Sequence, residues 1–174
     1  MLKINFWFFV ILSIMLLYDK NNIIACSLFS AFFHELGHLI FIILTKQRIK
    51  SFTFNSCVLN INLQNNLINN HQKLLISCGG CLFNFILIII GFWFSLKKLI
   101  IVNFSLFLFN ILPIYGLDGY DIIICTNITD KKINIISNVL NFLLLIIGIV
   151  LVFYNNISIL FISVYLYLIK KRSY

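Results

Sequence analysis

The chain has 174 residues, of which 61% are hydrophobic and only 10% are charged. A soluble domain of this length needs more charge to cover its surface, so the composition excludes that class and predicts a polytopic membrane protein. The net charge of +8 does not indicate nucleic-acid binding, because the basic residues lie at the ends of apolar segments, where they set topology. One proline and seven glycines leave little material for linkers, which favours a single membrane domain over residues 1–174.

The first two apolar segments are predicted to cross the membrane. Residues 6–17 form a short first span, and residues 23–44 form a second span long enough for about 30 Å of hydrocarbon. The second span contains three ionisable residues: His34, Glu35 and His38. Ionisable groups at membrane depth are costly, so a functional role is their default interpretation.

These three residues form an HExxH motif. On a helix, His34 and His38 return to the same face and can share one metal ion. Glu35 then lies near the open coordination position and can take a proton from a water molecule, as in zinc hydrolases. The motif is short and recurs by chance in soluble helices. In a membrane span an isolated carboxylate would oppose insertion, which favours the metal site.

A segment of alternating apolar and polar residues follows the second span. Residues 51–64 have the two-residue period of β-strands, with Phe52 and Phe54 on the first strand and a turn near Asn55 and Ser56. The sequence therefore predicts a small membrane-associated β-hairpin.

Four further spans are predicted, at residues 74–96, 99–109, 133–154 and 157–169. Six spans place both termini on one side, and all Lys and Arg residues except Lys20, Lys97 and Lys98 lie on that side. By the positive-inside rule this side is cytoplasmic. The expected fold is an all-α polytopic membrane protein of about six transmembrane helices, with the active site toward the cytoplasmic half.

The third metal ligand has two candidates. Two imidazoles leave a catalytic zinc site one protein ligand short, and the remaining carboxylates in membrane-embedded segments are Asp118 and Asp121. Pro113, Gly116 and Gly119 are expected to break the helix there. Asp118 is favoured because a broken helix can present its carboxylate inward. Its alternative role is a helix cap, and Asp121 stays open as the ligand.

Three motifs in this order resemble the site-2 protease family of intramembrane zinc metalloproteases, especially the branch of stage IV sporulation protein FB. They are HELGH at 34–38, Gly80-Cys81-Leu82-Phe83-Asn84, and Asn110-x-x-Pro113-x-x-x-Leu117-Asp118-Gly119. In the second motif, cysteine stands where the family usually has proline. The resemblance implies that His34, His38 and Asp118 bind one Zn²⁺ ion and that Glu35 is the general base. It also implies that the hairpin pairs with an unwound substrate segment.

The predicted function is therefore an intramembrane zinc metalloendopeptidase that cleaves a membrane-embedded or membrane-tethered protein. A role in sporulation, by releasing a transcription factor precursor, is implied only by the resemblance to the branch of stage IV sporulation protein FB. Four residues are expected to contact the substrate: Asn110, Asn84, Phe52 and Phe54. The commoner role of a membrane asparagine is an interhelical hydrogen bond, and the hairpin has the alternative role of covering the site.

Two other functions remain as alternatives. One is a metal-binding scaffold or chaperone of the same fold without proteolytic activity, against which the intact Glu35 argues. The other is a transporter, which the nearly complete absence of polar residues in the fifth and sixth spans disfavours. The expected partners are the lipid bilayer, the substrate and a regulatory membrane protein. No PDZ domain and no C-terminal regulatory domain are expected.

Overall fold

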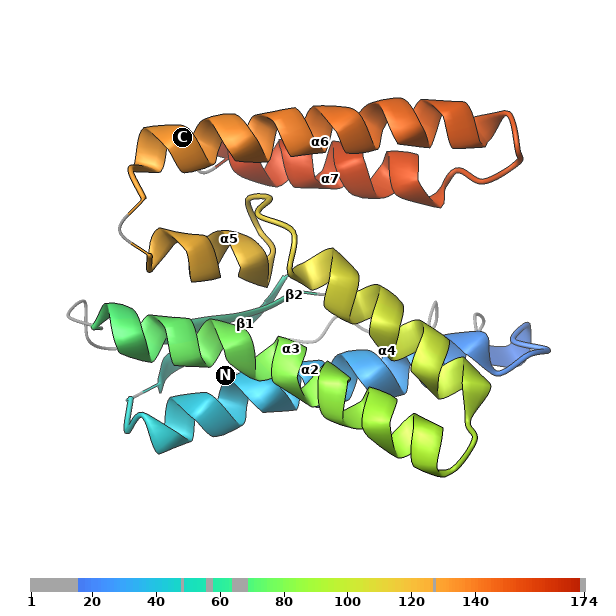
Figure 1. The fold of residues 1–174 in the computed structure, drawn as a ribbon, viewed down its shortest axis with the longest axis horizontal. Helices are drawn as coiled ribbons and strands as arrows, with labels where there is room; N and C mark the ends of the chain where they lie inside the picture. Colours follow the sequence, from blue (N-terminus) through green and yellow to red (C-terminus); the bar gives the residue numbers. More distant parts are fainter. Residues whose placement is uncertain (1–15, 48, 56–57, 64–68, 127, 173–174) are drawn as a thin grey trace. The chain divides into compact units, whose positions relative to one another are not determined.

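The computed structural model describes residues 16–172 apart from 48, 56–57, 64–68 and 127, and for 49–55, 58–63, 130 and 172 it describes the backbone alone (Figure 1). The predicted first span, residues 6–17, therefore lies outside the described residues except for residues 16 and 17. The chain folds as two compact units, residues 1–108 and 109–174. The expected single domain stays a prediction.

The first unit is built on two long helices, α2 (Ile23–Leu44) and α3 (Asn70–Trp93), which pack against each other (Figure 1). Their backbones approach closely at two glycines. A Cβ atom added to Gly79 would lie only 2.7 Å from the carbonyl oxygen of Gly37. Small residues allow this approach, as is common between membrane helices. The close crossing brings the HExxH helix against the middle of α3.

A two-stranded antiparallel sheet separates these helices in the chain. Strand β1 (Ile49–Asn55) pairs with β2 (Val58–Leu63), with Phe52 opposite Ile61 and Phe54 opposite Leu59. These strands occupy the segment in which alternating polarity predicted a hairpin.

Three of the described helices are long and apolar enough to cross a membrane: α2, α3 and α6 (Asp130–Val152). They correspond to the second, third and fifth predicted spans. Large apolar side chains such as Phe32, Phe92 and Phe142 are exposed on them, which suits contact with lipid.

The fourth and sixth predicted spans are shorter helices. Helix α4 (Lys97–Asn110) has 14 residues and α7 (Ser158–Arg172) has 15. At about 1.5 Å per residue they rise roughly 21 and 23 Å, less than the ~30 Å hydrocarbon core. The fold is thus helical with three candidate spans among the described residues, and six spans stay a prediction.

The second unit carries the break that Pro113 and the glycines predicted. Helix α4 ends at Asn110, and the short helix α5 (Asp118–Ile124) begins eight residues later. Gly116 lies between them with a φ of 91°, a left-handed conformation that side-chain-bearing residues rarely adopt. The break is confirmed.

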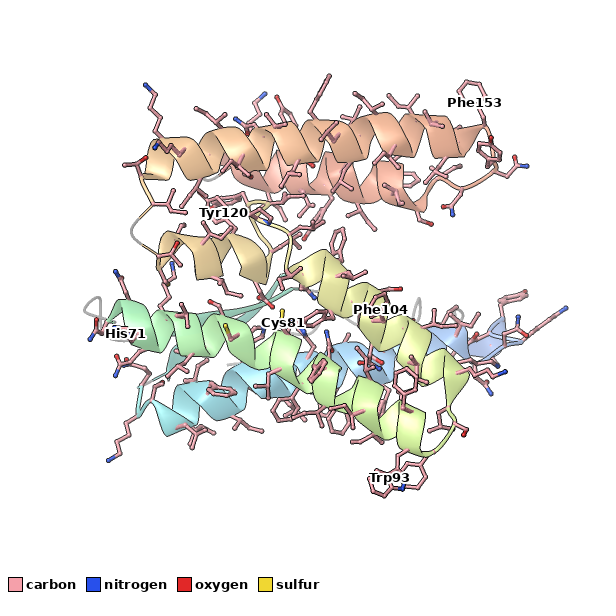
Figure 2. The ribbon with its side chains drawn as sticks, in the orientation of Figure 1. His71, Cys81, Trp93, Phe104, Tyr120 and Phe153 are labelled. Carbon is pink, nitrogen blue, oxygen red and sulfur yellow. The ribbon has the colours of Figure 1, made fainter. Side chains whose placement is uncertain are left out.

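Two hydrogen bonds connect this broken segment to α6. The backbone N–H of Tyr115 donates to Ser137 Oγ at 2.9 Å, and the hydroxyl of Tyr120, which is labelled in Figure 2, donates to Asn134 Oδ1 at 3.0 Å. The hydrogen bond of Tyr120 therefore holds α5, the helix that begins with Asp118, against α6.

Helices α6 and α7 pack together, and a Cβ atom on Gly148 would lie 2.7 Å from Leu160 Cα.

Candidate metal centre

The two histidines of the HExxH motif lie one turn apart on α2 with their Nε2 atoms 3.2 Å from each other. Two zinc–nitrogen bonds of about 2.0–2.1 Å at a tetrahedral angle separate their nitrogens by about 3.3 Å. The His34 and His38 rings are thus spaced as two ligands of one tetrahedral ion. His34 is buried and His38 is half-buried, so the site is shielded from bulk solvent within its unit.

The ring of His38 is oriented by the backbone of α3. Its Nδ1 lies 2.8 Å from the carbonyl oxygen of Ile76. A carbonyl only accepts, so Nδ1 carries the proton and donates. The Nε2 lone pair of His38 is then the one that faces a metal, which is the usual arrangement of a ligand histidine.

The ring of His34, on α2, has a side-chain partner on α3. Asn84 is fully buried, and its Nδ2 lies 3.1 Å from His34 Nδ1. The Oδ1 atom of Asn84 is buried and has no hydrogen-bond partner. The amide therefore contacts His34 directly, and the predicted contact of Asn84 with substrate stays a prediction.

Gly80 leaves the space that a metal ion needs beside the histidines. A Cβ atom on Gly80 would lie 2.5 Å from His38 Nε2 and 2.6 Å from His34 Nε2. Any side chain here would occupy the space next to both ligand nitrogens. The absence of a side chain and the two-imidazole donor set together fit a bound cation.

Sequence reasoning named Gly80 only as part of a motif and missed this role. A signal was present in the spacing: Ile76, Gly80 and Asn84 follow one another at intervals of four and so share one face of α3. That face meets the face of α2 that carries His34 and His38, four residues apart. Gly79, on the neighbouring face, does serve in packing, against Gly37.

Glu35 is half-buried on α2, next to His34 in the motif. In the second unit, Asp118 and Asp121 both lie in the first turn of α5 and are half-buried. The N-cap residue of α5 is Leu117, and Asp118 is the first residue of the helix.

The remaining predicted site residues are spread over other elements. Asn110 is half-buried at the end of α4, in the second unit. Phe52 and Phe54 lie on β1. Within the first unit, the structure thus brings His34, His38 and Asn84 together and adds Gly80 and the Ile76 carbonyl to them.

The fold is similar to a solved structure of the site-2 protease from Methanocaldococcus jannaschii. The TM-score is 0.66, the alignment covers 93% of this chain and 83% of that one, and the sequences are 20% identical. No protein-family model and no curated protein matches the sequence. The chain therefore shares the fold of a site-2 protease.

Proposed function

We propose that this chain is an intramembrane metalloendopeptidase that hydrolyses a peptide bond of a membrane-embedded or membrane-tethered protein. The observation that carries the proposal is the pair of HExxH histidines, with Nε2 atoms 3.2 Å apart, on a helix apolar and long enough to cross a membrane. The fold shared with a site-2 protease supports it.

We propose His34, His38 and Asp118 as the ligands of one zinc ion. The HExxH motif supplies the two imidazoles, and the resemblance of residues 110–119 to the third motif of the family supports Asp118 as the carboxylate ligand. Two imidazoles and one carboxylate are a known catalytic zinc set, and histidine nitrogens favour zinc over magnesium or calcium. Asp121 lies in the same turn of α5 as Asp118 and is the competing ligand.

Hydrolysis inside a membrane needs an activated water molecule and a place for its proton. A zinc ion held by these residues would lower the pKa of a bound water molecule to about 7 and would polarise the carbonyl of the scissile bond. Glu35 is the proton acceptor for the attacking water, and it returns the proton to the leaving amine. Glu35 is half-buried on α2 and directly follows His34 in the motif.

The substrate is proposed to bind in an extended conformation. A helical peptide is protected because its backbone is hydrogen-bonded, whereas an extended one can pair with an exposed strand edge. The sheet has two strands in the described part of the chain, so such an edge is available for β-augmentation. Phe52 and Phe54 on β1, together with Asn110 after the fourth helix, are the proposed substrate contacts.

The membrane arrangement follows from the same proposal. One domain of about six spans, with both termini cytoplasmic, would place the hairpin and the metal in the cytoplasmic half of the bilayer. Cleavage there would release a cytoplasmic fragment of the substrate. The most specific substrate that we propose is a transcription factor precursor in sporulation. This substrate rests on the motif resemblance alone.

The decisive experiment compares the native chain with Glu35→Gln in reconstituted membranes at matched zinc content, against a panel of tagged single-span substrates. Native cleavage that Glu35→Gln abolishes while zinc stays bound is the expected result. If both proteins hold zinc and neither cuts any substrate, the non-proteolytic scaffold replaces the protease. A native protein that binds no metal overturns the proposal.

A further inference from the structure

The buried amide of Asn84 has an unusual hydrogen-bonding position. The residue is fully buried, its Nδ2 lies 3.1 Å from His34 Nδ1, and its Oδ1 has no partner. Buried polar atoms almost always have a hydrogen-bond partner, and leaving one without costs free energy. An amide placed directly behind a ligand histidine therefore calls for a specific role.

Two proton patterns are compatible with these distances. In the first, Asn84 Nδ2 donates to His34 Nδ1, so His34 carries its proton on Nε2 and donates it to His38 Nε2 at 3.2 Å. In the second, a half-turn of the amide exchanges its two polar atoms, and Oδ1 accepts a proton from His34 Nδ1. Only the second pattern leaves the His34 Nε2 lone pair for a metal.

We propose that Asn84 is a positioning residue that selects the metal-binding tautomer of His34, with its Oδ1 accepting from His34 Nδ1–H. The inference rests on the proposed metal centre and adds a role to it. Between the two patterns the ring loses its Nε2 proton and gains one at Nδ1, so its charge does not change. An amide suits this position because it donates in one orientation and accepts in the other.

Helix α3 then orients both ligand histidines from one face. The Ile76 carbonyl accepts from His38 Nδ1, and two turns later Asn84 accepts from His34 Nδ1. Gly80 lies between these two acceptors and keeps the space beside both Nε2 atoms open. Such outer-shell partners fix ring orientation and raise the basicity of the ligand.

The chain offers a matched control in Asn103. This asparagine is also fully buried, and its amide also contacts a side chain of α2, because its Nδ2 donates to Ser30 Oγ at 2.9 Å. Ser30 lies one helical turn before His34. Asn103→Leu removes the same kind of interhelical hydrogen bond, but the partner that it loses is Ser30 and not a histidine ring.

The test measures the zinc affinity of the full-length chain in detergent by competition with a chelator, for the native protein, Asn84→Leu, Asn84→Asp and Asn103→Leu. Asn84→Leu should weaken zinc binding about 10–100-fold, the usual cost of losing an outer-shell partner. Asn84→Asp keeps the acceptor and should bind zinc much as the native protein does, and Asn103→Leu should leave the affinity unchanged.

A second readout does not depend on a variant that folds. Nitrogen-15 NMR of the zinc-loaded native protein should show both His34 and His38 protonated on Nδ1. Native affinity in Asn84→Leu, equal losses in Asn84→Asp and Asn84→Leu, or a His34 ring that binds zinc through Nδ1 would each overturn the inference while the metal centre stands. A native protein that binds no zinc would overturn the metal centre itself.

Discussion

His38 donates its Nδ1 proton to the carbonyl oxygen of Ile76 across 2.8 Å, so a backbone atom of α3 orients a side chain of α2. Every residue type supplies the same carbonyl, so this hydrogen bond persists through substitutions at residue 76 as long as α2 and α3 keep their crossing. His34 depends instead on the side chain of Asn84. The crossing of the two helices is thus the structural condition for the metal centre, and the glycines at it are the positions where substitution is most informative.

Gly80→Ala is expected to abolish metal binding. The new methyl group would lie 2.5 Å from His38 Nε2 and 2.6 Å from His34 Nε2, in the space beside both ligand atoms. The measurement is the zinc content of the purified protein, together with cleavage of a substrate. The control is Gly91→Ala on the same helix, where the added Cβ meets Ile100 Cγ1 at 2.8 Å and not a histidine ring. Native zinc content in Gly80→Ala would contradict the predicted geometry.

Gly79→Ala should instead act on stability. Its Cβ would lie 2.7 Å from the Gly37 carbonyl oxygen, and backbone cannot move aside as a side chain can. Overpacking of this kind costs about 1–3 kcal/mol, so the free energy of unfolding should fall by that order. Denaturation in detergent measures it. An unchanged unfolding free energy would mean that α2 and α3 do not cross at these glycines.

The apolar pattern predicted part of this arrangement well, for a physical reason. Residues 23–44 lie between polar loops, and α2 has the same bounds. Helix α4 ends at Asn110, three residues before Pro113, because proline cannot continue the hydrogen-bonding of a helix. Hydropathy was less informative for α4 and α7, since a short apolar run does not decide whether a helix crosses the bilayer.

The surroundings of the histidines could be predicted only in part. The HExxH motif predicted His34 and His38 as a pair because both lie on one helix at a fixed spacing. The roles of Ile76, Gly80 and Asn84 depend on which face of α3 meets α2, a contact between residues about 40–50 apart in the chain. Every residue has a backbone carbonyl, so the sequence does not show which carbonyl orients a histidine. Nor does it distinguish a glycine that leaves space for an ion from a glycine that allows close helix packing.

The choice between the two aspartates can be settled by a pair of neutral substitutions. Asp118→Asn should lower zinc affinity by more than the 10–100-fold typical of an outer-shell loss, because a metal ligand itself is removed, and it should abolish cleavage. Asp121→Asn, in the same turn of α5, should retain both properties. Chelator competition and substrate cleavage are measured on both. The opposite pattern would assign the third ligand to Asp121.

The hydrogen bond between Tyr120 and Asn134 should matter for activity through the placement of α5. Tyr120 is buried, and its hydroxyl donates to Asn134 Oδ1 at 3.0 Å, holding the helix that begins with Asp118 against α6. Removing one hydrogen bond costs about 1 kcal/mol, so Tyr120→Phe and Asn134→Leu should each reduce stability by that order and lower the cleavage rate. The double variant should be no worse than either single one, because both remove the same interaction. Strictly additive losses in unfolding free energy would show that the two residues act independently, and the placement of Asp118 would then rest on other contacts of α5.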